Sequence, residues 1–353
     1  MQKKETKDLL ANLTGTKTEQ IPIWFLRQAG RYLPEYQEIR KKNSFLNICQ
    51  SPKLACEITL QPLRRYDLDA AIIFSDILFP LTAVGQKLTF TKGEGPQLTP
   101  PIRTKTDLKK LNFDLFEEKV SAIGEALSLV KSQLDDKKTL IGFAGAPFTV
   151  ASYMIEGAPT KNFAHLKRLL FSDQETYSEI MTFLVEMTRR YLKIQIDAGA
   201  DTLMLFDTWA GQMSPLDFQE YSKKYLTPIF NYIHQEGTPL IYYPGANVES
   251  FLKLDTSKLS CLAVDWRISF RQALECIEKK YVNKYELCLQ GNLDPQCLLG
   301  SESFVRSRTQ QIINEIQKLG INHYIFNVGH GLLPTTPLES LNWVIDEVKK
   351  FKL

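Results

Sequence analysis

The chain has 353 residues, of which 44% are hydrophobic and 24% charged, as in an ordinary soluble globular protein. Its 43 Lys and Arg nearly balance 40 Asp and Glu, and the lysine pairs are scattered, which argues against a nucleic-acid-binding tract. No apolar run of about 18 residues could span a membrane, and the first eight residues lack the apolar stretch of a signal peptide. We therefore expect a cytoplasmic protein that binds neither nucleic acid nor membrane. Its six cysteines show no Cys-x-x-Cys spacing, which favours buried free thiols.

A short helix at about Lys4–Leu13 is predicted to precede a series of short β-branched or aromatic runs. Most of these runs are apolar on consecutive residues, as expected of parallel strands that are covered on both faces. The predicted strands, in chain order, are Ile21–Arg27, Ala70–Asp76, Thr139–Gly145, Thr202–Asp207, Pro239–Pro244, Cys261–Trp266, Leu287–Asn292 and His323–Val328.

Helix-start and helix-stop signals separate these runs. Ser51-Pro52 and Ser214-Pro215 each place a capping hydroxyl before a proline in the first helical turn. Gly199, Gly237 and Gly320 follow helical stretches, where a left-handed residue is favoured. Eight strands with crossover helices predict a single (β/α)8 TIM barrel that occupies residues 1–353. A doubly wound open sheet is the competing fold, but it usually carries a Gly-rich turn after its first strand, and none occurs here.

One segment departs from the strand–helix repeat. Leu88–Thr91, followed by Lys92-Gly93-Glu94-Gly95-Pro96, predicts a β-hairpin inserted after the second strand. The insertion is too short to form a second domain.

Polar residues stand at nearly every predicted strand end, which is where barrel enzymes place their chemistry. No lysine ends a strand, which argues against a Schiff-base aldolase. The four histidines form no close cluster with Cys or Glu, and neither a P-loop nor a dinucleotide motif occurs, so we expect no metal and no cofactor. The strand ends read Arg27, Asp76, Gly145-Ala146-Pro147, Asp207-Thr208, Pro244-Gly245, Asp265-Trp266, Gly291-Asn292 and Gly329-His330-Gly331.

The loop Trp24–Pro34 holds two arginines, Arg27 and Arg31, on either side of small residues. Guanidinium groups bind carboxylates through paired, charge-assisted hydrogen bonds, so this loop suits a polyanionic ligand. The alternative is that both arginines neutralise acids of the rim, such as Asp76 or Asp207. The residues alone leave both interpretations open.

Asp76 ends an apolar strand and should enter a poorly hydrated mouth. A carboxylate there must be paired, or must serve a cationic or N–H-rich ligand. Its alternative role is that of a structural partner for Arg27 or Arg31. His330 lies between two glycines directly after the last strand, and the alternative for it is a solvent-facing loop histidine.

Two further polar residues follow strands of the predicted barrel. Tyr153 lies in the stretch Gly145–Met154, where a tyrosine is as often a packed aromatic residue as a ligand contact. Thr208, in Phe206–Gly211, is a candidate for the rim but also suits a simple cap of the following turn.

At these residues the chain resembles the uroporphyrinogen decarboxylase family. The resemblance is carried first by Pro22–Tyr36, a long and specific arginine loop, and it runs from about residue 20 to residue 340. The further matches are Phe74–Leu78, Gly145–Thr149, Tyr153-Met154, Phe206–Trp209, Asp265-Trp266, Gly291–Pro295 and Asn327–Gly331.

The resemblance implies a TIM-barrel homodimer of tetrapyrrole (haem) biosynthesis. Such an enzyme removes carbon dioxide from the four acetate side chains of uroporphyrinogen III, without metal or organic cofactor, and gives coproporphyrinogen III. Carried over by position, the implied catalytic residues are Asp76, Arg27 and Arg31. The implied substrate contacts add the backbone of Gln28-Ala29-Gly30 and the side chains of Arg40, Tyr153, Thr208 and His330.

One loop departs from the family pattern. Tyr243-Pro244-Gly245-Ala246-Asn247 follows the fifth predicted strand, where a lysine-glycine ending is expected, so the contacts of this loop stay open.

Two other functions remain as alternatives. Corrinoid- or cobalamin-related methyltransferases share this barrel family but use a zinc held by His and Cys, and no such ligand set occurs in the sequence. A tetrapyrrole carrier would bind the same ligand without turnover.

Overall fold

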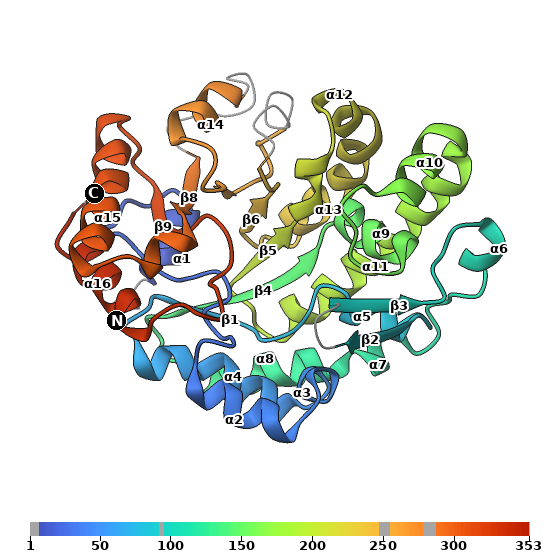
Figure 1. Ribbon diagram of the computed structural model, residues 1–353, viewed down its shortest axis with the longest axis horizontal. Helices are drawn as coiled ribbons and strands as arrows, with labels where there is room; N and C mark the ends of the chain where they lie inside the picture. Colours follow the sequence, from blue (N-terminus) through green and yellow to red (C-terminus); the bar gives the residue numbers. More distant parts are fainter. Residues whose placement is uncertain (1–6, 92–94, 247–254, 278–286, 353) are drawn as a thin grey trace.

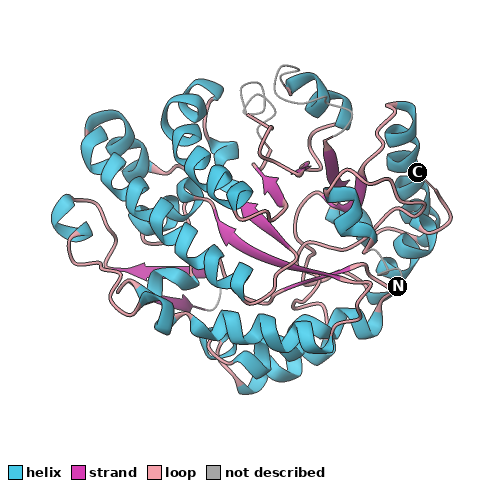
Figure 2. Ribbon diagram, turned by 180° about the vertical axis from the view of Figure 1, so that it is seen from behind, coloured by secondary structure: helices cyan, strands magenta, loops and turns pink. Residues whose placement is uncertain are grey.

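The computed structural model describes residues 7–91, 95–246, 255–277 and 287–352, in which a curved parallel sheet lies inside a layer of helices (Figure 1). Its seven strands pair in the order β1-β4-β5-β6-β7-β8-β9, and each pairing is parallel. Figure 2 shows these strands from behind, surrounded by helices. The strands are β1 Ala70–Ile72, β4 Thr139–Gly145, β5 Thr202–Phe206, β6 Leu240–Tyr243, β7 Cys261–Ala263, β8 Cys288–Leu293 and β9 Tyr324–Val328.

Each of these strands overlaps one predicted run, and the apolar character of the runs has the expected cause. All seven residues of β4, for example, are buried, because one face of the strand lies inside the curved sheet and helices cover the other. Two strands end well before their predicted ends: β1 stops at Ile72, before Asp76, and β7 stops at Ala263, before Trp266. The polar residues Asp76 and Asp265 therefore lie beyond the ladder, whereas β8 extends to Leu293 and keeps Asn292 paired.

The prediction of a strand at Ile21–Arg27 is wrong, because the segment makes only a single bridge, between Ile23 and Phe326. Pro22 has no N–H, and side chains occupy two of the following backbone donors, while the N–H of Trp24 donates to Phe326 O at 3.4 Å. The N–H of Ile23 donates to Asp69 Oδ2 at 2.7 Å, and that of Leu26 to Asn327 Oδ1 at 2.9 Å. The segment still lies between the two sheet edges, since Pro22 O accepts from the Phe326 N–H at 2.8 Å and Ile23 O accepts from the Asp69 N–H at 2.9 Å.

The helices begin and end where the sequence signals indicated. Ser51 Oγ accepts from the N–H of Leu54 at 3.4 Å, and Ser214 Oγ accepts from the N–H of Asp217 at 3.1 Å. Gly199, with φ +93°, follows its helix in the left-handed region, as do Gly237 and Gly320. The α-helices are α1 Asp8–Leu13, α2 Pro34–Lys42, α3 Phe45–Cys49, α4 Pro52–Arg65, α5 Phe79–Ala83, α6 Lys105–Leu108, α7 Phe116–Lys119, α8 Ser121–Gln133, α9 Pro147–Glu156, α10 Ala164–Ser172, α11 Gln174–Asp197, α12 Pro215–Asp217, α13 Lys223–Gln235, α14 Phe270–Cys276, α15 Glu302–Lys318 and α16 Leu338–Val348; η1 Thr208–Gln212 and η4 Pro295–Leu299 are 3₁₀, and η2 Phe218–Ser222 is a π-helix.

Two elements lie outside the strand–helix repeat. β2 Lys87–Thr91 and β3 Gly95–Thr99 pair antiparallel beside α5, and the predicted turn residues 92–94 lie outside the described residues. Helix α1 contacts β9, and Asn12 Oδ1 accepts from the N–H of Tyr324 at 3.2 Å; the predicted start of this helix at Lys4 is also outside the described part.

All six cysteines are free, five of them buried. Among the described residues, no helix is both long and apolar enough to cross a membrane.

Candidate active site

The arginine loop between the sheet edge and α2 is anchored by the buried side chain of Gln28. Its Oε1 accepts from the N–H of Phe25 at 3.1 Å, and its Nε2 donates to Ala70 O, in β1, at 2.9 Å. Tyr32 closes the turn by donating its hydroxyl to Gln28 O at 2.8 Å. Arg27 adopts φ +61°, a strained region for a residue with a Cβ, and its side chain is exposed.

Arg27 and Arg31 are exposed, and among the described residues neither lies within ion-pairing distance of a carboxylate. The acids of the rim have other partners. Asp207 is buried and accepts from Thr149 Oγ1 at 2.8 Å and from Tyr242 Oη at 3.0 Å, while Asp76 Oδ1 accepts from a backbone N–H. The geometry therefore favours the interpretation that the two arginines are available to an external anion.

Asp76 follows β1 and stands partly exposed at the strand end. Its Oδ1 accepts from the N–H of Leu78 at 2.8 Å. Burial raises the pKa of Asp76 above its usual range, while the Leu78 N–H and the nearby Arg27 guanidinium oppose that rise. The result is a carboxylate that is poorly hydrated but not ion-paired, so part of its hydrogen-bonding capacity is free for a ligand.

The loop after β9 brings His330 to the same place. A Cβ added to Gly331 would lie 2.3 Å from Arg27 Cδ, so this glycine leaves the space that the arginine stem fills. Burial lowers the pKa of His330, and the charges of Arg27 and Arg267 lower it further. The charge of Asp265 and a backbone hydrogen bond with Gly331 raise this pKa in part. The imidazole is therefore neutral at neutral pH and can both donate and accept a hydrogen bond.

Tyr153 and Thr208 lie on neighbouring elements. Tyr153 is half-buried on α9, and its ring centroid is 6.0 Å from that of Trp209, in η1. Burial raises the pKa of Tyr153, with smaller effects from Asp76 and Arg27 that place all three in one electrostatic environment. Thr208 is the first residue of η1, and a Cβ on Gly245 would lie 2.5 Å from its carbonyl oxygen. The atypical loop after β6 thus packs on the Thr208 backbone, whereas its Asn247 lies outside the described residues.

The uroporphyrinogen decarboxylase (URO-D) family model matches residues 4–351, almost the whole chain. The chain belongs to this family. It is 39% identical to the uroporphyrinogen decarboxylase of Thermodesulfovibrio yellowstonii, over 96% of each chain. It is 40% identical to that of Nitrosococcus oceani, over 98% of this chain and 96% of the relative.

A solved structure, a methyltransferase from Methanosarcina mazei, shares the fold with a TM-score of 0.79 over 98% of this chain and 99% of that one. At 19% identity this likeness shows the fold alone. Within the described ranges, no group of three or more His, Cys, Asp or Glu is arranged to hold a metal ion.

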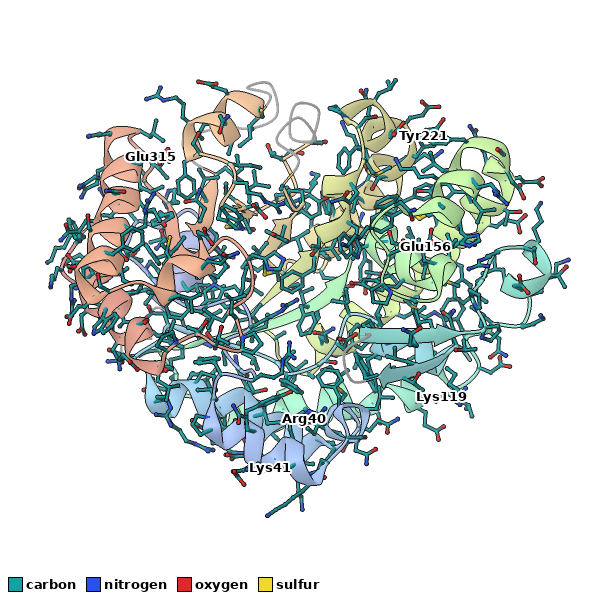
Figure 3. The ribbon with its side chains drawn as sticks, in the orientation of Figure 1. Arg40, Lys41, Lys119, Glu156, Tyr221 and Glu315 are labelled. Carbon is teal, nitrogen blue, oxygen red and sulfur yellow. The ribbon has the colours of Figure 1, made fainter. Side chains whose placement is uncertain are left out.

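The remaining residues carried over from the uroporphyrinogen decarboxylase family are partly committed to the protein itself. The N–H of Gln28 donates to Phe25 O at 2.9 Å and its carbonyl accepts from Tyr32, so of the three residues Gln28-Ala29-Gly30 the last two have backbone N–H groups without a partner among the described residues. Arg40 is half-buried on the inner side of α2, whereas Lys41 lies at the outer edge (Figure 3). The Nη1 of Arg40 donates to Asn43 O at 2.5 Å.

Two residues of the mouth were missed as functional candidates, Tyr243 and Arg267. Both hydrogen-bond to the fully buried Asp265, at 2.8 Å from Tyr243 Oη and 2.8 Å from Arg267 Nε. The signal in the sequence was the unusual Tyr243 at a strand end, together with the neighbouring pair Asp265-Trp266. Nothing in the sequence indicated that the ends of β6 and β7 meet through these side chains.

Proposed function

We propose that this protein is a uroporphyrinogen decarboxylase that converts the four acetate side chains of uroporphyrinogen III to methyl groups, giving coproporphyrinogen III in haem biosynthesis. The family match over residues 4–351 carries the proposal. The site supports it, because Arg27 lies near the partly buried carboxylate of Asp76, and neither Arg27 nor the exposed Arg31 of the same loop has a carboxylate partner among the described residues. Such a mouth suits a ligand that has many carboxylates around a ring of N–H donors.

The reaction needs an electron sink, which the substrate itself supplies. Protonation of a pyrrole α-carbon makes the ring cationic. The bond from the acetate methylene to its carboxylate then breaks, carbon dioxide leaves, and the electron pair neutralises the ring. A proton adds to the exocyclic methylene to form the methyl group, and loss of the α-proton restores the pyrrole. One proton is consumed for each carbon dioxide released.

Asp76 accepts hydrogen bonds from the pyrrole N–H groups and stabilises the ring cation as it develops. A carboxylate held in place by the Leu78 N–H needs little reorganisation during the reaction. Burial strengthens its interaction with the cation, because few water molecules screen the charge. Asp76 is therefore the principal catalytic residue in this mechanism.

The arginine loop binds the substrate carboxylates. Arg27 and Arg31 hold acetate and propionate groups through paired hydrogen bonds, and Arg27 is also a candidate for positioning the proton donor, since a guanidinium is itself a poor acid. Ala29 and Gly30 offer backbone N–H groups in the same loop, with Gln28 as their support and Arg40 as a further cation. Tyr153, Thr208 and His330 orient the macrocycle and the reacting acetate.

The architecture proposed for the whole chain is one TIM-barrel domain over residues 1–353. The segment Pro22–Trp24 occupies the position of the eighth strand, between β1 and β9. Its hydrogen bonds to both sheet edges support closure of the sheet into a barrel. The family resemblance supports a homodimer in the cytoplasm.

Anaerobic incubation with uroporphyrinogen III, followed by chromatography of the oxidised porphyrins, tests the proposed activity. We expect the octacarboxylic porphyrin to disappear and the tetracarboxylic product to accumulate. Binding without loss of carboxyl groups identifies a tetrapyrrole carrier instead and contradicts the proposal.

The same assay tests the prediction that no metal or cofactor is needed. We expect full activity after treatment with a chelator and exhaustive dialysis, because the electron sink is the substrate ring. A parallel sample given back zinc or magnesium is the control. Loss of activity that one metal restores would contradict a cofactor-free reaction and favour the metal-dependent alternative.

Asp76 also predicts how activity depends on pH. Its anion is the active form and its pKa is raised by burial, so kcat/KM should fall as the pH drops through a value above that of an ordinary aspartate. Asp207 is the other candidate for such a limb, since burial raises its pKa to about 6. A pH profile of Asp207→Asn separates the two carboxyls: an unchanged acid limb supports Asp76, and its disappearance assigns the limb to Asp207.

A further inference from the structure

The carboxylate of Asp265, in the loop after β7, is fully inaccessible to solvent and is held by its own loop and by the end of β6. Its Oδ1 accepts from the backbone N–H of Arg267 at 3.0 Å and from Arg267 Nε at 2.8 Å. Its Oδ2 accepts from Arg267 Nη2 at 2.9 Å and from Tyr243 Oη at 2.8 Å. These bonds stabilise the charged form, and the pKa of Asp265 is held below its usual range despite its burial.

Tyr243 connects this carboxylate to the loop that carries His330. Its side chain is 3% exposed, and its hydroxyl also lies 3.2 Å from the carbonyl oxygen of Gly329. A phenol has a single hydrogen, so the hydroxyl is shared between two acceptors from different loops, one after β7 and one after β9. Loss of the hydroxyl therefore removes a side-chain donor that joins these two loops.

The Gly329 backbone has little freedom to move towards β7. A Cβ added at this glycine would lie 2.2 Å from the backbone nitrogen of Trp266. On the other side, Gly331 packs on the stem of Arg27. The His330 backbone is thus held between two close contacts, and the hydroxyl of Tyr243 fixes the carbonyl that precedes it.

We propose that Tyr243 is a positioning residue, whose hydroxyl bridges Asp265 and the Gly329 carbonyl and so sets the place from which His330 orients the substrate. The inference rests on the proposed function of His330 and deepens it. Tyr243 itself acts through the loop and not by touching the reacting atoms. The charged groups that face His330 are Arg27, Asp265 and Arg267.

The test is Tyr243→Phe, with Tyr324→Phe as the matched control. Tyr324 is also buried and also donates its hydroxyl to a backbone carbonyl, that of Gly291, but among the described residues that hydroxyl makes no hydrogen bond to the His330 loop. We expect kcat/KM of Tyr243→Phe to fall ~3- to 10-fold, mostly through KM, which corresponds to the loss of about one buried hydrogen bond. The control should keep wild-type kinetics even if its melting temperature falls.

A second measurement does not depend on turnover. The chain has four histidines, and the spectrum of His330→Asn identifies the resonance of His330 in an NMR titration. In Tyr243→Phe this imidazole should titrate at higher pH than in wild type, because the released loop is better hydrated and Asp265 has lost a hydrogen-bond donor. Tyr324→Phe should leave the titration unchanged.

The outcomes separate this inference from the proposed function. A titration and kinetics of Tyr243→Phe that match wild type, even with a lower melting temperature, would reduce Tyr243 to a structural residue and overturn the inference. Equal shifts in both variants would also overturn it, since they would indicate general loosening of the barrel. If wild-type protein fails to decarboxylate uroporphyrinogen, the proposed function fails, while the histidine titration still reports whether Tyr243 positions the loop.

Discussion

Asp76→Asn should fold normally and lose activity by about 10²- to 10³-fold in kcat, the usual cost of removing one well-placed electrostatic contact. The amide keeps the shape of the side chain and can still accept the N–H of Leu78. It lacks the charge that stabilises the ring cation, so the loss should appear in kcat more than in KM. Steady-state kinetics with uroporphyrinogen measure the effect, and thermal unfolding checks the fold.

Asp136→Asn is the matched control for this prediction, because Asp136 is an exposed aspartate in the turn before β4, at the opposite end of the strands. Its activity should equal that of wild type. Activity of Asp76→Asn close to wild type, on verified substrate, would mean that Asp76 only caps the turn at Leu78.

Arg31→Lys is expected to fold normally and to lower kcat/KM by roughly tenfold to a hundredfold, since each charge-assisted hydrogen bond contributes about 1.5–3 kcal/mol. Lysine keeps the charge but lacks the planar fork, so paired hydrogen bonds to a carboxylate become single ones. The exposed side chain of Arg31 has no carboxylate partner among the described residues, so the melting temperature should not change. Kinetics and thermal unfolding are measured on the same preparation.

Arg64→Lys provides the comparison, because Arg64 is an exposed arginine that binds Glu57 through two hydrogen bonds, of 2.7 and 2.9 Å, away from the strand ends. Its activity should be unaffected. A destabilised but fully active Arg31→Lys would show that this arginine is structural and does not hold the substrate.

The strand pattern was readable from the sequence because parallel strands buried on both faces must be apolar on consecutive residues. Helix ends were also predictable, because they depend on local chemistry. Ser51-Pro52 caps the start of α4, and the left-handed Gly199 follows α11. Asp76 and His330 could also be recognised, since each is a polar residue directly beyond an apolar run. In all these cases the information lies within a few neighbouring residues.

The segment Ile21–Arg27 shows where local pattern fails. It has the composition of a strand, but the N–H groups of Ile23 and Leu26 are taken by Asp69 and Asn327, which lie 46 and 301 residues away from them in the chain. Such competition between side chains and a ladder is invisible until the chain has folded.

Whether the arginines are ion-paired also depends on the tertiary structure. A guanidinium near several acids can be paired or free, and composition does not distinguish the two. Asp207 is withdrawn from Arg27 because Thr149 and Tyr242 occupy both of its oxygens, and Gly331 leaves the space that the arginine stem fills. Sequence alone indicated several candidates at the strand ends, because a polar residue directly after an apolar run is recognisable, but it missed Tyr243 and Arg267. Which of them are free for a ligand depends on hydrogen bonds between distant loops, and those exist only in the folded chain.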